Sequence, residues 1–261
     1  MILAHEFVPR FISELHFSKP VSLDDNFRVY EKFLRQLGYD GATYTFVPKI
    51  QIEVMTDMAT VFLSTESYPQ GFIDQYAKEQ LQKYDFTVRR ITEGYMKPMD
   101  WREHELKGLV TQEELAVITL AREQYGIKNA LSIPMSYEER GGAGASVISY
   151  KEDDEFNQLK ANTLETLVAI TRLFHERVFN HEDLAHKFIM PILATLTPTE
   201  IAILKYKASG QTMKQFKDHT SISMSHATNV LSRLRKRLGG VSMERLLYLL
   251  GLLNTLGEMP E

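Results

Sequence analysis

Polar and aromatic side chains recur between residues 68 and 101 in a pattern suited to holding a small molecule. Tyr68, Phe72 and Tyr76 follow one another at intervals of four residues, Asp85 comes nine residues later, and Trp101 is the only tryptophan. A buried carboxylate can accept a hydrogen bond from an amide N–H, and tyrosine hydroxyls can donate to a carbonyl. An indole ring adds a flat apolar wall, so these residue types could together contact a partly apolar ligand.

The same residues have a simpler interpretation. Aromatic side chains usually pack in the core of a domain, and Tyr68, Tyr76 and Trp101 could do only that. Asp85 fits this interpretation only if it caps a helix at the surface. The residue types alone leave both interpretations open.

A second polar pattern lies on a helix that is predicted from Ser223 to Gly239. Its apolar residues recur at helical spacing and form one stripe: Ala227, Val230, Leu231, Leu234 and Leu238. Another face carries short hydrogen-bonding side chains first and long cations later, as a helix that enters the major groove requires. We therefore expect contacts to DNA from Ser225, Thr228, Asn229, Ser232, Arg233, Lys236 and Arg237, and from Lys214 upstream. An ordinary amphipathic surface helix with a basic end is the alternative.

The segment before this helix carries strong helix signals. Thr197 can cap a helix, Pro198 suits its first position, and Glu200 completes a capping box. We expect this helix to end near Gly210.

Residues 196–239 resemble the helix-turn-helix of LuxR-type transcription regulators. Glu200, Leu204 and Gly210 match the family pattern at its spacings, and Ile222, Ser223, Leu238 and Gly239 match the ends of its recognition helix. The departures are His226-Ala227, Val230 and Gln215-Phe216-Lys217. The resemblance implies that the protein binds double-stranded DNA at a near-palindromic operator, and that it does so as a homodimer.

The segment from Tyr68 to Trp101 is similar to the quorum-sensing domain of the same regulators, which binds acyl-homoserine lactones. Tyr68, Pro69, Tyr76, Asp85 and Trp101 match the family pattern. The departures are Phe72 for a tryptophan, Phe86 for a proline and Ala130 for a glycine. The family tryptophan donates to the lactone carbonyl, and losing one buried hydrogen bond costs about 1–3 kcal/mol. The resemblance implies a small-molecule signal, which is an acyl-homoserine lactone or a related apolar compound.

Composition limits the other classes of protein. The chain has 261 residues, of which 44% are hydrophobic and 25% charged, and it has no cysteine, which excludes disulfides and thiolate metal sites. Net charge is −4, but residues 196–261 carry nine Lys or Arg against five acidic residues, so the two parts differ in sign. With no signal-peptide pattern and no long apolar run, we expect a cytoplasmic protein without membrane contact. We expect no enzymatic activity, no metal and no cofactor.

The N-terminal part alternates helix and strand signals. Strands are predicted at 42–47, 61–64, 131–137 and 145–150, and helices at 27–37, 69–83, 111–125 and 153–179. These elements predict an α+β domain, an antiparallel sheet with helices on its faces as an α/β/α sandwich, followed by an all-α helix-turn-helix domain. The expected boundaries are 1–180 for the sensor domain, 181–195 for a linker and 196–261 for the DNA-binding domain. On the strands, we expect Tyr44, Phe46 and Val147 to line the ligand site.

Two alternative functions remain open. A regulator of the same build could respond to a non-lactone ligand or to none. A phosphorylation-dependent response regulator would need an acidic pair, a phosphoacceptor and a lysine, for which Asp24-Asp25, Asp57 and Lys107 are candidates. These residues do not follow buried apolar strands, which argues against that class.

Overall fold

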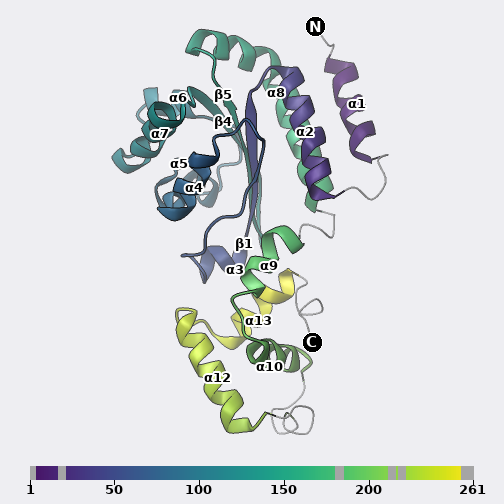
Figure 1. The fold of residues 1–261 in the computed structure, drawn as a ribbon, viewed down its shortest axis with the longest axis vertical. Helices are drawn as coiled ribbons and strands as arrows, with labels where there is room; N and C mark the ends of the chain where they lie inside the picture. The colour runs from purple at the N-terminus through teal and green to yellow at the C-terminus, as the bar shows by residue number, and fades with distance from the viewer. Residues whose placement is uncertain (1–3, 17–21, 180–184, 211–215, 217–221, 254–261) are drawn as a thin grey trace. The chain divides into compact units, whose positions relative to one another are not determined.

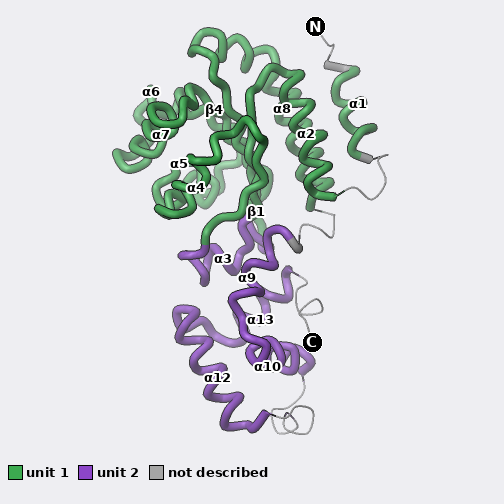
Figure 2. The backbone as a smooth tube through the Cα atoms, viewed as in Figure 1, with its two compact units in different colours: residues 1–46, 59–138, 142–184 green, residues 47–58, 139–141, 185–261 purple. Residues whose placement is uncertain are grey.

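The computed structural model describes residues 4–16, 22–179, 185–210, 216 and 222–253. They form two compact units (Figure 2). The first unit comprises residues 1–46, 59–138 and 142–184, and the second comprises residues 47–58, 139–141 and 185–261. Each unit is described separately below.

The first unit is built around a five-stranded sheet with the strand order β2-β1-β5-β4-β3. The strands are β1 (Gly41–Pro48), β2 (Leu63–Ser64), β3 (Met99–Asp100), β4 (Asn129–Glu138) and β5 (Gly141–Ser149). Pairing is antiparallel between β1 and β2, where Thr43 lies opposite Ser64, and between β3 and β4, where Met99 lies opposite Ser132. This architecture confirms the predicted antiparallel sheet with helices.

Helices cover both faces of this sheet (Figure 1). One face carries α1 (Ala4–His16), α2 (Leu23–Leu37) and α8 (Asp153–Phe179). The other carries α4 (Gln70–Lys78), η1 (Leu81–Tyr84), α5 (Phe86–Thr92), α6 (Trp101–Leu106) and α7 (Gln112–Tyr125). Local signals explain several of the ends: Gly38 ends α2 with a left-handed φ of 101°, and Thr111 starts α7 with a complete capping box.

The face under α8 is filled by large aromatic side chains. Tyr30 stacks on Phe174 with ring centroids 4.8 Å apart, and Tyr44 meets Phe174 edge-on at 5.1 Å. The buried hydroxyls in this layer have partners, because Tyr30 bonds with Thr171 and Tyr44 with His175 Nδ1, each at 2.8 Å. These two tyrosine hydroxyls are therefore satisfied within the core under α8.

The turn between β4 and β5 is shorter than predicted. The strands predicted at 131–137 and 145–150 leave seven residues between them, but β4 extends to Glu138 and β5 starts at Gly141. Gly141 has a φ of 152°, a backbone conformation that side chains disfavour, so a glycine allows the chain to reverse within two residues. The neighbouring glycines belong to the strand.

The second unit is mostly helical. Its elements are α3 (Lys49–Glu53), η2 (a π-helical turn, Ala185–Ile189), α9 (Met190–Leu193), α10 (Pro198–Ala208), α12 (Met224–Arg237) and α13 (Met243–Leu252). The predicted capping box at Thr197 and Glu200 is present, and Ser223 caps α12 by accepting from the His226 N–H at 3.2 Å. The all-α C-terminal part is confirmed.

No single helix among the described residues is long and apolar enough to span a membrane. Two consecutive helical segments, Lys187–Leu193 and Pro198–Ala208, meet the length and hydropathy criteria only when they are taken together, and their axes differ by 105°.

Candidate functional site

Asp85 stands at the start of α5 and anchors the predicted ligand site. Its Oδ1 atom accepts hydrogen bonds from the Thr87 N–H at 2.8 Å and from the Thr87 hydroxyl at 2.7 Å. Its Oδ2 atom accepts from the Tyr76 hydroxyl at 2.9 Å. Asp85 therefore caps α5, as the core-packing interpretation of the sequence required. Its carboxylate, however, points to the buried Tyr76 rather than to open solvent.

The surroundings of Asp85 disfavour its charge. Burial raises the pKa of this carboxyl, and the hydrogen bonds from Thr87 and Tyr76 oppose that rise only in part. Burial together with the nearby Asp85 carboxylate raises the pKa of Tyr76 well above its usual range, so the phenol keeps its proton. A hydrogen-bond donor on a ligand would be a favourable partner for this carboxylate, because it would replace part of the lost hydration.

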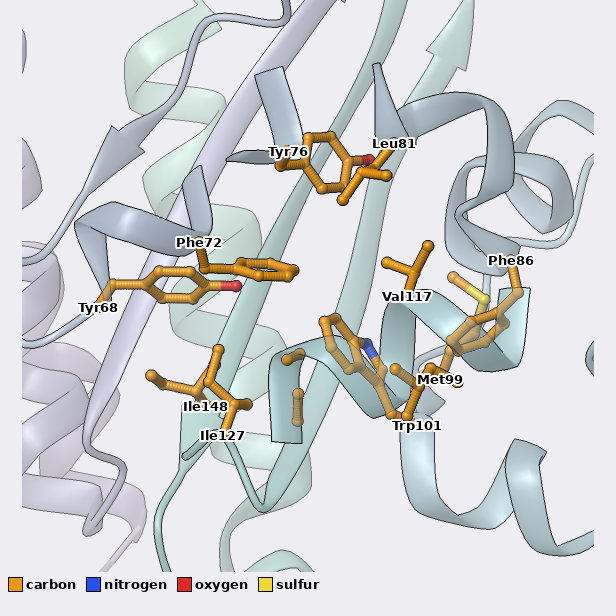
Figure 3. Packing of buried hydrophobic residues seen from close by; sticks show 13 residues of the cluster. Tyr68, Phe72, Tyr76, Leu81, Phe86, Met99, Trp101, Val117, Ile127 and Ile148 are labelled. Carbon is orange, nitrogen blue, oxygen red and sulfur yellow. The ribbon is translucent and has the colours of Figure 1, made fainter. Parts of the chain in front are cut away.

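The aromatic residues of α4 and its approach form one wall of the same site (Figure 3). Phe72 lies between two tyrosines, with ring centroids 6.4 Å from Tyr68 and 6.0 Å from Tyr76. Its ring also meets Tyr125 of α7 at 5.5 Å. All three predicted aromatics on this segment are buried, at 4% exposure for Tyr68 and Phe72 and 7% for Tyr76. The spacing of four residues places them on one side of the helix.

Trp101 faces the same cluster from the start of α6 (Figure 3). Its indole N–H donates to the Ser132 hydroxyl of β4 at 2.9 Å. Since Ser132 accepts with its oxygen, its own proton is free to point elsewhere. Tyr68, Phe72, Tyr76 and Trp101 are therefore brought together with Asp85 in one region of the first unit.

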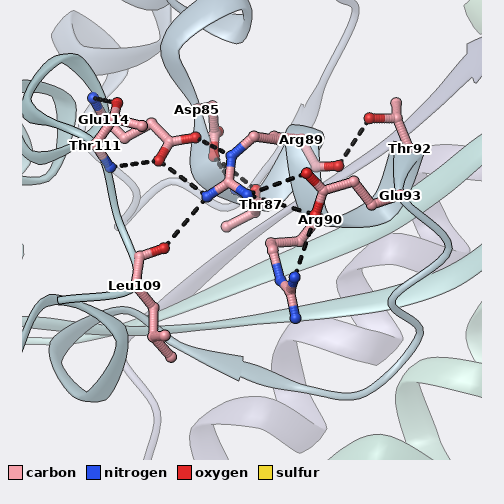
Figure 4. A network of polar contacts seen from close by, with 9 residues as sticks. All are labelled: Asp85, Thr87, Arg89, Arg90, Thr92, Glu93, Leu109, Thr111 and Glu114. Carbon is pink, nitrogen blue, oxygen red and sulfur yellow. Dashed lines mark hydrogen bonds and ion pairs between the residues drawn. The ribbon is translucent and has the colours of Figure 1, made fainter. Parts of the chain in front are cut away.

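An ion-pair network holds α5, and with it Asp85, against α7 (Figure 4). The Arg89 guanidinium donates to both carboxylate oxygens of Glu114, at 2.6 and 3.1 Å, and to the Leu109 carbonyl at 3.2 Å. Burial would raise the pKa of Glu114, but the hydrogen bonds from Arg89 and the Thr111 N–H outweigh it and the pKa is lowered. Sequence reasoning did not identify this network, because its residues are ordinary surface types in their local context.

Three other predicted ligand residues lie on the opposite face of the sheet. Tyr44 and Phe46 of β1 contact α8, where Tyr44 bonds with His175 and the Phe46 ring lies 5.7 Å from Phe179. On β5, Ile148 belongs to the cluster with Tyr68, so its neighbour Val147 points to the other side. The structure therefore does not bring Tyr44, Phe46 and Val147 together with the cluster around Tyr68, because each lies one residue out of register with the strand residues that face it.

The residues that do face the cluster are the neighbours of those three. Alternation along the strands turns Thr43 and Ser146 toward α4, and both hydroxyls affect the pKa of Tyr68 through hydrogen bonding. Ser132 and Thr87 also join the site through Trp101 and Asp85. Period-two alternation is the signal that could have found the strand residues, given one correctly assigned neighbour.

Helix α12 presents the polar face predicted for a recognition helix. Ser225, Asn229, Ser232, Arg233 and Lys236 are exposed, as are Thr228 and Arg237. Ala227, Val230 and Leu234 are buried, and a core around Ile203, Tyr206 and Phe216 packs against this stripe. Phe216, one of the residues that depart from the family pattern, is thus a core residue with no exposed surface.

Two of these polar side chains are already engaged within the helical part. The Thr228 hydroxyl donates to the Met224 carbonyl at 2.9 Å, and Arg237 forms an ion pair with Glu200 of α10 at 3.0 Å. Arg237 thereby joins the two helices. Lys214 lies outside the described residues. Leu246, Leu249 and Leu250 of α13, and Leu253 directly after it, are at most 2% exposed and pack inside the unit.

The residues of the phosphorylation alternative lie on separate elements. Asp24 and Asp25 lie in the first turn of α2, where Asp25 pairs with Arg28 at 2.6 Å. Lys107 pairs with Glu103, and Asp57 belongs to the other unit. In the part of the chain that the structure describes, no group of three or more His, Cys, Asp or Glu could hold a metal ion.

Comparisons with known proteins agree with this architecture. Residues 22–178, more than half of the chain, match the family model of the autoinducer binding domain. Escherichia coli SdiA has a similar fold, with a TM-score of 0.56 at 14% identity over 97% of this chain and 98% of that one. SdiA in complex with octanoyl-rac-glycerol gives a TM-score of 0.51 at 16% identity, over 95% of this chain and 94% of that one. No curated protein sequence matches the chain.

Proposed function

The chain belongs to the family of proteins with an autoinducer-binding domain, and from this premise we propose that it is a LuxR-type transcription regulator that responds to a small molecule. The half-buried Asp85 side chain, whose carboxylate accepts from the Tyr76 hydroxyl of the aromatic cluster, carries the proposal. The hydrogen bonds from Thr87 and Tyr76 offset the cost of placing this carboxylate in apolar surroundings only in part, and a ligand amide or hydroxyl would add a further donor.

The ligand that this site suits combines one donor with apolar surface. We propose an acyl-homoserine lactone or a related apolar signal, whose N–H would bind Asp85 while its remaining groups contact Phe72 and Trp101. Phe72 has no N–H to donate, which favours signals that need no donor at that point. A non-lactone signal is therefore the second candidate, and octanoyl-rac-glycerol, which a complex with SdiA contains, is a suitable probe of it.

DNA binding is the second half of the proposal. The exposed face of α12 would enter the major groove, with Ser225 and Asn229 near the bases and Arg233 and Lys236 near phosphates. A homodimer would place two such helices about one DNA turn apart on a near-palindromic operator. The opposite charges of the two parts of the sequence support this division of roles.

Thermal unfolding against a series of acyl-homoserine lactones of increasing chain length tests the ligand half. A ligand at about 100 times its dissociation constant adds about 2.7 kcal/mol of stability, which raises Tm by several degrees at this size. We expect a shift that peaks at one chain length in the wild type and is lost in Asp85→Ala. If neither a lactone nor octanoyl-rac-glycerol shifts Tm, the proposed ligand response is wrong.

A further inference from the structure

The two sequence neighbours of Trp101 both form ion pairs with α8. Asp100, which precedes it, pairs with Lys160. Arg102, which follows it, donates to Asp153 at 3.1 Å. Asp153 and Lys160 are seven residues apart on α8, about two helical turns, so both project from the same side of that helix. The only tryptophan of the chain is therefore tied to α8 through the residue on either side of it.

These ion pairs reach around an edge of the sheet. Strand β3, which Asp100 ends, is the last strand in the sheet order and is only two residues long. Helix α6 begins with Trp101 on one face of the sheet, whereas α8 covers the other face (Figure 1). A ladder of two residues supplies few backbone hydrogen bonds. The charged side chains therefore add most of the restraint on the start of α6.

Asp100 has the burial and the contacts of a residue that fixes the local backbone. Its side chain is 6% exposed. One carboxylate oxygen accepts from the Glu103 N–H at 3.0 Å and so caps α6, and the other accepts from the Lys160 ammonium group. Its backbone carbonyl accepts from Nδ1 of His104 at 2.8 Å. Because a buried carboxylate is costly without a charged partner, its position depends on Lys160.

The Trp101 ring takes its orientation from this backbone. The indole has a single polar group, the N–H that donates to the Ser132 hydroxyl at 2.9 Å. Ser132 lies opposite Met99 in the pairing of β3 with β4, so the indole and the backbone are anchored to the same stretch of β4. A shift of the short strand β3 would therefore turn the ring relative to the aromatic cluster that it faces (Figure 3).

We propose that Asp100 and Lys160 are positioning residues of the signal-binding site, and that their ion pair holds the Trp101 ring in the orientation that contacts the signal. This inference rests on the proposed ligand-binding function and adds two residues that lie outside the aromatic cluster. Neither side chain contacts the signal, and Trp101 carries their effect. The Arg102–Asp153 pair supports the same backbone less strongly, because its side chains are 32% and 49% exposed and solvent screens them.

Tryptophan fluorescence tests the positioning step directly, because Trp101 is the sole tryptophan and the emission reports on one ring. Asp100→Asn keeps the cap of α6 but removes the charge, and Lys160→Gln removes the partner charge. In the folded protein without ligand, we expect both variants to shift the emission maximum and to increase quenching by acrylamide.

Dissociation constants measure the consequence for the signal, with N-octanoyl-homoserine lactone and octanoyl-rac-glycerol as probes. Each variant should weaken the binding of a probe that binds the wild type by about twofold to tenfold. The double variant should bind no more weakly than the weaker single variant, because one ion pair carries both effects. Weakening that multiplies in the double variant would contradict the role of the pair.

Lys107→Gln is the matched control, since Lys107 forms an exposed ion pair with Glu103 at the end of α6 that does not involve α8. It should leave the emission and both dissociation constants unchanged. If Asp100→Asn and Lys160→Gln lower Tm but keep the emission and the affinities of the wild type, the pair is only structural and the inference is wrong, while the ligand-binding proposal stands. Lys160→Gln alone decides this if Asp100→Asn does not fold. If the wild type binds neither probe, the ligand-binding proposal fails, and this inference fails with it.

Discussion

Replacing Asp85 by asparagine separates the ligand role of this carboxylate from its structural role. Asparagine caps helices as well as aspartate does, and its carbonyl can still accept from Thr87. The variant therefore keeps the start of α5 but removes the buried charge. We expect Asp85→Asn to be more stable than the wild type at neutral pH in the absence of ligand, and to lose the ligand response.

The sign follows from the pKa of Asp85, which burial raises. In the unfolded chain an aspartate titrates near about 3.9, so between that pH and the folded pKa the folded protein holds a proton that the unfolded chain has released. The stability of the wild type consequently falls as the pH rises through this window, and it stays lower above the window. Each unit of pKa difference costs about 1.4 kcal/mol, and each kcal/mol moves Tm by about 2–4 °C at this size.

Thermal unfolding without ligand, from pH 4 to pH 8, measures this effect as the difference in Tm between wild type and variant. The difference should grow in favour of Asp85→Asn as the pH rises and then level off. Asp74→Asn is the control, because Asp74 is an exposed residue of α4. A variant that is less stable than the wild type at pH 7, or a difference that does not depend on pH, would refute the account of Asp85.

Four further predictions follow from contacts within the first unit. Glu114→Gln should lower the free energy of unfolding in urea by about 1–3 kcal/mol, because Arg89 loses a buried carboxylate partner; an unchanged midpoint would contradict the role of this pair. Tyr44→Phe should cost about 0.5–1.5 kcal/mol through the lost bond to His175 but leave ligand-induced shifts in Tm unchanged, and a lost shift would place Tyr44 in the site after all. Burial lowers the pKa of His175 to about 4, so stability should fall as the pH drops from about 6.5 toward 4, and a Gln in its place should flatten that limb. Phe72→Trp should raise lactone affinity about tenfold in calorimetry if an indole donor reaches the lactone carbonyl, whereas reduced affinity would indicate a different ligand pose.

Residues on helices were easier to assign to the site than residues on strands. Tyr68, Phe72 and Tyr76 were assigned through the match to the family pattern, and the structure gathers them in one cluster. On β1 and β5 the large residues Tyr44 and Val147 look more like a ligand wall, but they fill the core under α8. In a strand that is buried on both faces, residue size does not tell which face looks at the site, and an error of one residue reverses the answer.

Contacts between distant segments could not be predicted at all. The Arg89–Glu114 pair joins α5 to α7, and the indole of Trp101 reaches Ser132 of β4 across 31 positions in the sequence. Nothing in the local pattern of either residue marks its partner. The capping boxes at Thr111 and Thr197, by contrast, depend on residues three apart. Such local hydrogen bonds can be predicted from residue types and spacing, whereas pairing between distant segments depends on the fold.

Selection of bound duplexes from a random-sequence DNA library, with and without the lactone that gives the largest shift in Tm, tests the central claim most directly. We predict enrichment of a near-palindromic site whose half-sites lie about 10 base pairs apart, a degree of enrichment that changes with ligand, and loss of enrichment in Arg233→Ala. Lys236→Ala should mainly reduce the salt dependence of binding. A folded wild-type protein that enriches no sequence under either condition would contradict the proposal that this chain is a ligand-responsive DNA-binding regulator.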